Sequence, residues 1–85
     1  MKSYKHEYPD RVVYVNKDGF KHREDGPAIE YHDGSRSWWK DGNLHRLDGP
    51  AAEFDGVKYW YLNGKFIPVR TQEEFERYLK LIVFQ

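Results

Sequence analysis

Two copies of one short motif place a histidine and an aspartate three residues apart. Residues 22–28 read HREDGPA and residues 45–51 read HRLDGPA, an offset of 23 residues. An imidazole and a carboxylate at this spacing could bind a metal ion or exchange a proton in acid–base catalysis. Because the motif occurs twice within one small domain, we favour a structural role for His22, His45, Asp25 and Asp48. In that role each aspartate accepts backbone N–H bonds at its own turn, and the neighbouring arginine or histidine braces it.

Two glutamates at equivalent positions of the repeat are the next candidates for chemistry. Glu30 and Glu53 each lie eight residues after a motif histidine, and a pair of carboxylates is what glycosidases use. We favour exposed strand positions, where each glutamate pairs with Arg36 or Lys58 across a hairpin. The sequence has no phosphate-binding loop, nucleophile elbow or dinucleotide fingerprint, so we expect a protein that is not an enzyme.

The residue types present argue against a metal or cofactor site. The chain has no cysteine, and cysteine is prominent among the four ligands of structural zinc sites. The remaining histidines, His6 and His32, lie in no motif. We therefore expect neither a metal nor a cofactor.

The motif belongs to a longer repeat. Residues 33–42 match residues 55–64 at an offset of 22, and residues 17–19 precede the first motif as residues 40–42 precede the second. Self-similarity at this period indicates one supersecondary unit used more than once. The chain holds about two and a half such units, and the whole of residues 1–85 is expected to form one domain.

Each unit reads as short strands separated by tight turns. Glycine after Asp or Asn favours a hairpin turn, because glycine adopts positive φ without a Cβ clash. Strands are predicted over residues 11–15, 28–31, 36–39, 51–54 and 58–62. Turns are predicted at Asp18-Gly19, Asp33-Gly34, Asp41-Gly42, Asp55-Gly56 and Asn63-Gly64, and structural turns also at Asp25, Gly26, Pro27 and at Asp48, Gly49, Pro50.

The end of the chain changes to a helical period. Thr71 and Glu74 fit a capping box, and Phe75, Tyr78, Leu79 and Ile82 follow as an amphipathic stripe. A helix is predicted over residues 71–83, lying on one face of the sheet or capping its end. The expected fold is therefore α+β: a twisted antiparallel β-meander of tandem hairpins with one C-terminal helix.

Aromatic residues stand next to one another in two predicted strands. Adjacent strand residues face opposite sides of a sheet, so we expect Trp38 and Trp60 to build the core. Trp39, Tyr59 and Tyr61 would then lie on the other face, either under the helix or exposed. Exposed rings beside arginine have the composition of a binding hot spot. The candidate partner-binding residues are Trp39, Tyr59, Tyr61, Arg36 and Arg46, and a core or homodimer seam remains the alternative.

Charge and hydropathy restrict the classes of partner. The chain carries 14 basic and 14 acidic residues, whereas a nucleic-acid-binding protein is usually clearly basic. Nucleic acid is therefore an unlikely partner, although stacked aromatic and basic residues keep single strands as an alternative. No signal-peptide segment or bilayer-length apolar run is present, so we expect a cytoplasmic protein without a membrane partner. An open sheet edge leaves a homodimer possible.

Residues 11–66 resemble tandem repeats that are common in bacteriophage proteins. The resemblance rests on the HRxDGPA motif, the aromatic residue after Glu30 and Glu53, the Asp-Gly turns, the Trp-aromatic pairs and the closing Asn63-Gly64-Lys65. Such repeats are distantly similar to MORN repeats and to the MORN-like antitoxins of the YwqK family.

The resemblance implies hairpin stacks and a role in protein–protein interaction. The expected function is a non-catalytic phage or prophage accessory protein. It would inhibit a bacterial host factor, such as a defence component, by covering its surface. This would be a counter-defence role of the anti-CRISPR kind. The alternatives are an antitoxin that neutralises a toxin and a protein that binds single-stranded nucleic acid.

Overall fold

Hairpins, one after another, account for most of the chain. The computed structural model describes residues 2–83, with the side chain of Val83 left aside. Within this range the chain forms one helix and a series of short strands, which confirms the predicted α+β class. The strands are β1 Tyr4–Glu7, β2 Arg11–Val15, β3 Ile29–Tyr31, β4 Arg36–Ser37, β5 Trp39–Lys40, β6 Asn43–Leu44, β7 Ala52–Phe54, β8 Val57–Leu62 and β9 Lys65–Ile67; the helix is α1 Gln72–Val83.

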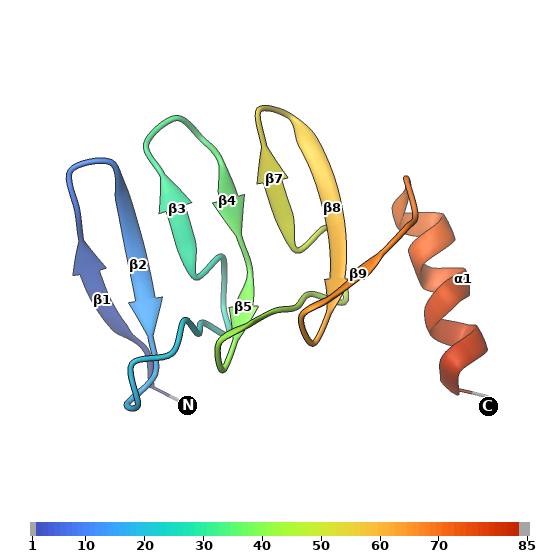
Figure 1. Cartoon of the computed structure of the whole chain (residues 1–85), viewed down its shortest axis with the longest axis horizontal. Helices are drawn as coiled ribbons and strands as arrows, with labels where there is room; N and C mark the ends of the chain where they lie inside the picture. The colour runs from blue at the N-terminus through green and yellow to red at the C-terminus, as the bar shows by residue number, and fades with distance from the viewer. Residues whose placement is uncertain (1, 84–85) are drawn as a thin grey trace.

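Seven strands form one antiparallel sheet in the order β1-β2-β3-β4-β7-β8-β9, while β5 and β6 pair separately. Figure 1 shows three hairpins side by side, with α1 beyond β9 at the far end. The molecule measures 40 × 28 × 17 Å, so its thinnest dimension leaves little room for a second layer over the sheet. The repeats therefore form a thin row in which each hairpin contacts its neighbours.

The predicted turns are confirmed by their backbone angles. Glycine has positive φ at the five predicted hairpin turns (Gly19, Gly34, Gly42, Gly56 and Gly64), and at three of them the preceding residue does so as well: Asp41 (46°), Asp55 (51°) and Asn63 (48°). Two consecutive residues of positive φ are the signature of the type I′ turn, whose twist matches that of the flanking strands.

Most strand predictions are confirmed, and one is corrected. The strand expected over residues 11–15 is β2, and those over 28–31, 51–54 and 58–62 agree with β3, β7 and β8 to within one residue. The strand expected over 36–39 is interrupted at Trp38, because the chain leaves the large sheet there and residues 39–40 pair with β6. The short strands β1, β6 and β9 were not predicted.

The largest buried apolar side chains gather at the helical end of the row, while smaller ones such as Ala28 and Ala52 are buried along it. Trp60, Ile67 and Phe75 form a buried cluster, against which Leu62, Val69, Tyr78 and Leu79 pack. This agrees with the expected core position of Trp60, but Trp38 is only half-buried. The predicted helical stripe holds at its first three positions, whereas Ile82 is 40% exposed.

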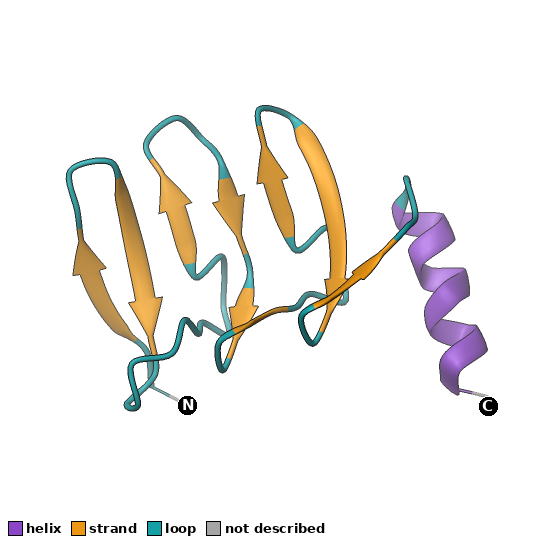
Figure 2. Ribbon diagram, viewed as in Figure 1, coloured by secondary structure: helices purple, strands orange, loops and turns teal. Residues whose placement is uncertain are grey.

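The helix caps the end of the sheet. The Glu74 N–H donates to Thr71 Oγ1 (3.1 Å), as the predicted capping box requires. Glu74 Oε1 reaches back to the N–H of Arg70 (3.0 Å) rather than to that of the cap residue Thr71. Gln72 joins the helix to the sheet: its Oε1 accepts from Trp60 Nε1 (2.8 Å), and its Nε2 donates to the Leu47 carbonyl (3.1 Å). Figure 2 shows the helix beside the last strands, so α1 closes the row as a terminal unit.

Candidate functional site

Each copy of the motif folds into a loop that its own arginine closes. Arg23 Nε donates to Asp25 Oδ1 (3.1 Å) and its Nη1 donates to the Pro27 carbonyl (3.2 Å). In the second copy, Arg46 makes the same two bonds, at 2.9 Å to Asp48 and 3.2 Å to the Pro50 carbonyl. The guanidinium groups therefore brace both loops as expected. The expected backbone N–H bonds are corrected: within the described residues, Asp25 and Asp48 accept from their arginine side chains instead.

Each guanidinium also stacks on an aromatic ring of the strand before its loop. Arg23 Cζ lies 4.0 Å from the centroid of the Tyr14 ring, and Arg46 Cζ lies 3.7 Å from that of Trp38. Burial lowers the pKa of Arg23, but its hydrogen bonds to Asp25 and Glu30 outweigh this and raise the pKa above the ordinary value. Both guanidinium groups are thus held between a ring and a carboxylate.

The motif glycines leave room for these guanidinium groups. Gly26 and Gly49 do not have positive φ. Instead, a Cβ atom at Gly49 would lie 2.6 Å from Arg46 Cζ, and one at Gly26 would lie 3.2 Å from Arg23 Cζ. Close approach of the arginine, rather than positive φ, therefore accounts for the preference for glycine in the Asp-Gly-Pro turn.

The motif histidines connect each loop to the turn of the next hairpin. His22 Nδ1 accepts the N–H of Asp41 (3.0 Å), and His45 Nδ1 accepts the N–H of Asn63 (3.0 Å). His22 is 1% exposed, and its Nε2 lies 3.8 Å from Glu24 Oε1. A ring nitrogen that accepts an N–H carries no proton of its own, so these imidazoles act as backbone acceptors.

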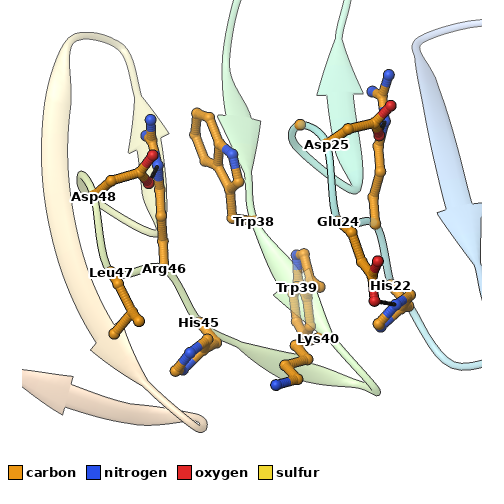
Figure 3. Close-up of a pocket in the computed structure, with 12 residues that line it drawn as sticks. His22, Glu24, Asp25, Trp38, Trp39, Lys40, His45, Arg46, Leu47 and Asp48 are labelled. Carbon is orange, nitrogen blue, oxygen red and sulfur yellow. Dashed lines mark hydrogen bonds and ion pairs between the residues drawn. The ribbon is translucent and has the colours of Figure 1, made fainter. Parts of the chain in front are cut away.

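An open cleft lies between the two loops. Figure 3 shows the first motif on one side, the second on the other, and Trp38 and Trp39 between them. We call this the inter-repeat cleft; its volume is about 690 Å³. Its lining residues are His22, Arg23, Glu24, Asp25, Gly26, Trp38, Trp39, Lys40, His45, Arg46, Leu47 and Asp48.

The structure brings together only some of the predicted partner-binding residues. Trp39 and Arg46 line the cleft, and Arg36 Cζ lies 5.2 Å from the Trp38 ring centroid. Tyr59 and Tyr61 are not among the lining residues; Tyr61 packs edge-to-face on Phe66, with centroids 5.6 Å apart. Trp38 and Trp39 both line the cleft, while the guanidinium of Arg36 lies over the Trp38 ring and Trp39 Nε1 donates to Ser37 Oγ (2.8 Å).

Sequence reasoning missed three cleft residues as binding candidates: Trp38, Leu47 and Glu24. Leu47 is 55% exposed although it is apolar. One signal was available in the sequence, because the Trp-Trp-Lys segment lies between two copies of a motif that forms similar loops.

The groups that could do chemistry are already engaged in the cleft. His22, His45, Asp25 and Asp48 all line it, yet both aspartates bond their own arginine and both Nδ1 atoms bond a backbone N–H. Across the described residues, no group of three or more His, Asp or Glu side chains could hold a metal ion. The arrangement suits binding better than proton transfer.

The glutamates considered for glycosidase chemistry lie on the strands instead. Glu30 and Glu53 both stand opposite Arg36 in the sheet register, and Glu53 also stands opposite Lys58. Glu30 pairs with Arg23 at 2.8 Å and Glu53 pairs with Arg36 at 3.4 Å. The structure therefore places both carboxylates in ion pairs along exposed or half-buried strand positions.

Comparison with known proteins gives no further assignment. No family model matches the chain, and neither a curated protein nor a solved structure matches it. The resemblance of residues 11–66 to phage and MORN-like repeats stays a prediction. Within residues 2–83, no helix is long and apolar enough to span a bilayer.

The arrangement around Gly49 leads to a first prediction. In Gly49→Ala the new methyl group must displace the Arg46 guanidinium from Trp38, so we expect a loss of about 1–2 kcal/mol in the free energy of unfolding. Gly26→Ala, with its wider spacing, should cost less. Chemical denaturation of both variants measures the difference.

An Arg46→Ala background provides the control for this prediction. Without the guanidinium, the Gly49→Ala penalty should disappear, since a double-mutant cycle isolates the contact. An equal penalty in both backgrounds would show that the glycine serves another purpose.

His45 gives a second prediction, on pH. Burial, and secondly the positive charge of Lys40, lower the pKa of His45 below its ordinary value of 6.5. The unfolded chain then binds a proton more readily, so His45 contributes stability above pH 6.5 that is lost as the pH falls through the folded pKa. Lys40→Gln should reduce the acid-induced loss, by less than about 1 kcal/mol because the site is largely solvated.

The measurement is the free energy of unfolding between neutral and mildly acidic pH. Lys17→Gln serves as a charge-matched control and should behave as the wild type. A Lys40→Gln profile identical to that of the control would contradict the assignment.

Proposed function

We propose that the protein is a non-catalytic binding module that holds another protein in its inter-repeat cleft. The observation that carries the proposal is the cleft itself, which presents Trp38, Trp39 and Arg46 from a braced framework. Trp and Arg are enriched among residues that dominate binding energy at protein interfaces. Because the loops are pinned on both sides, little side-chain entropy would be lost on binding.

The rim of the cleft supports a protein partner of mixed polarity. Leu47 offers an exposed apolar contact, while Lys40 and Glu24 add one charge of each sign. Such a surface fits a partner that inserts an apolar side chain and meets the rim with polar groups.

Charge pairing makes a nucleic-acid partner the weaker hypothesis. Four arginines that could contact phosphates already pair with carboxylates: Arg11 with Asp10, Arg23 with Asp25 and Glu30, Arg36 with Glu53, and Arg46 with Asp48. A phosphate would have to compete with these acids, and affinity for nucleic acid depends mainly on free cations.

The biological setting follows from the resemblance of the repeats to phage proteins. On that basis the partner would be a bacterial host factor in the cytoplasm, such as a defence component, inhibited by occlusion of its surface. An antitoxin that neutralises a toxin is the second candidate. Higher phage plating on a defended host would support the first, and rescue of growth from a co-expressed toxin would support the second.

The test of the cleft compares capture by matched variants. Leu47→Asp and Trp39→Ala should each weaken binding of the captured host protein by at least about tenfold, because they change the rim and the floor of the cleft. Tyr59→Ala removes an exposed ring outside the cleft and should bind as the wild type. Pull-down with mass spectrometry identifies the partner, and calorimetry with that purified partner measures affinity.

Two outcomes would contradict this proposal. Unchanged affinity of the folded Leu47→Asp variant would exclude the cleft as the binding site. Loss of binding in Tyr59→Ala but not in Trp39→Ala would move the site to the face of β8.

A further inference from the structure

The first strand of the sheet has an open side. In the sheet order β1 pairs only with β2, and in Figure 1 it forms the edge opposite the helix. All four of its residues are exposed. An edge of this kind presents unpaired backbone groups to other chains.

The hydrogen-bond pattern shows which residues present those groups. Tyr14 donates its N–H to the Ala28 carbonyl and accepts the His22 N–H, so its backbone groups are directed away from β1. Lys5 stands opposite Tyr14, and Glu7 stands opposite Val12 two residues along. Because backbone direction alternates along a strand, Lys5 and Glu7 direct their N–H and carbonyl groups outward.

The side chains of the same two residues carry opposite charges on one face of the strand. Lys5 Nζ lies 3.3 Å from Glu7 Oε1, and both side chains are more than half exposed. Two residues apart in a strand, they share a face. The edge therefore offers one positive and one negative group beside its outward backbone groups.

Charge selects one register for pairing two such edges. In an antiparallel pair with His6 opposite His6, Lys5 of each chain faces Glu7 of the other, and these residues form the hydrogen-bonded positions. A shift by two residues in either direction places Lys5 opposite Lys5 or Glu7 opposite Glu7, which is unfavourable. In the favoured register, the exposed ring of Tyr4 faces that of Tyr8.

We propose that β1 is a self-association surface, which pairs antiparallel with β1 of a second copy of this chain about a two-fold axis. Lys5 and Glu7 exchange four backbone hydrogen bonds with Glu7 and Lys5 of the second copy and form two ion pairs across the axis. The two seven-stranded sheets become one continuous sheet.

The ends of the sheet limit this assembly to two copies. Pro9, just beyond β1, has no N–H to extend the new ladder. Helix α1 lies beyond β9 at the other end, so the two ends differ and the two-fold contact closes on itself. The surface is small, so the association is weak and concentration-dependent. It is independent of the binding proposed for the inter-repeat cleft.

Charge reversal tests both the surface and its register. Lys5→Glu places acidic side chains opposite each other, and Glu7→Lys places basic side chains opposite each other. The dissociation constant of each variant's dimer should therefore rise by about tenfold or more. The double variant K5E/E7K restores both ion pairs and should associate as the wild type. An equimolar mixture of the two single variants should form a heterodimer, because the doubly acidic edge of one variant then faces the doubly basic edge of the other.

Sedimentation velocity over a range of protein concentrations measures these equilibria. Lys65→Glu, a charge reversal at the opposite end of the sheet, is the matched control and should not change association. Circular dichroism verifies that each variant is folded. A wild type that stays monomeric at every concentration would overturn the proposal. Single variants that associate as the wild type does would also overturn it, as would an equimolar mixture of the two that forms no heterodimer.

Discussion

One kind of hydrogen bond ties each repeat of this protein to the next. The backbone N–H of a turn residue with positive φ, Asp41 or Asn63, is donated to Nδ1 of the histidine in the preceding motif. The next residue in each turn is a glycine, and it donates its N–H to the carbonyl of the residue before that histidine. Gly42 donates to Lys21, and Gly64 donates to Leu44. The type I′ turns at Asp41-Gly42 and Asn63-Gly64 are thus each held by two bonds to the preceding repeat. A thin sheet with few fully buried side chains depends on such links, since burial alone gives a chain of this size modest stability.

The same links explain why a cleft forms at the junction of repeats. The motif histidine holds each loop to the next turn through a hydrogen bond. The motif arginine stacks on an aromatic ring of the preceding segment, Tyr14 or Trp38. The loops therefore stand at fixed positions one repeat apart, and the segment between them is lined by Trp38 and Trp39. At the last junction, Gln72 of the helix accepts a hydrogen bond from the indole N–H of Trp60 and donates one to the carbonyl of Leu47. Trp60 is only 3% exposed there. The open cleft thus lies at the repeat junction that the helix does not cover.

Local signals in the sequence predicted the fold well, and long-range contacts explain what they missed. Asp-Gly and Asn-Gly pairs located the turns because positive φ is a property of one or two residues. Alternation, however, implies a continuous strand, and it failed at Trp38, where a turn further along draws the chain into a second pairing. The requirement for Gly49 comes from a guanidinium three residues earlier, and the role of His22 from an N–H 19 residues later. Neither contact can be predicted from the secondary-structure propensities or the hydrophobic periodicity of the sequence.

The central claim is that the duplicated motif organises the backbone, and the protonation of its histidines tests this most directly. Long-range ¹H–¹⁵N NMR at neutral pH distinguishes the two ring nitrogens. Our account predicts that Nε2 carries the proton and Nδ1 is free to accept in both His22 and His45. Asp41 Oδ1 lies 3.3 Å from His22 Nδ1. A proton found on Nδ1, donated to that carboxylate, would contradict the claim that the imidazole accepts the turn N–H.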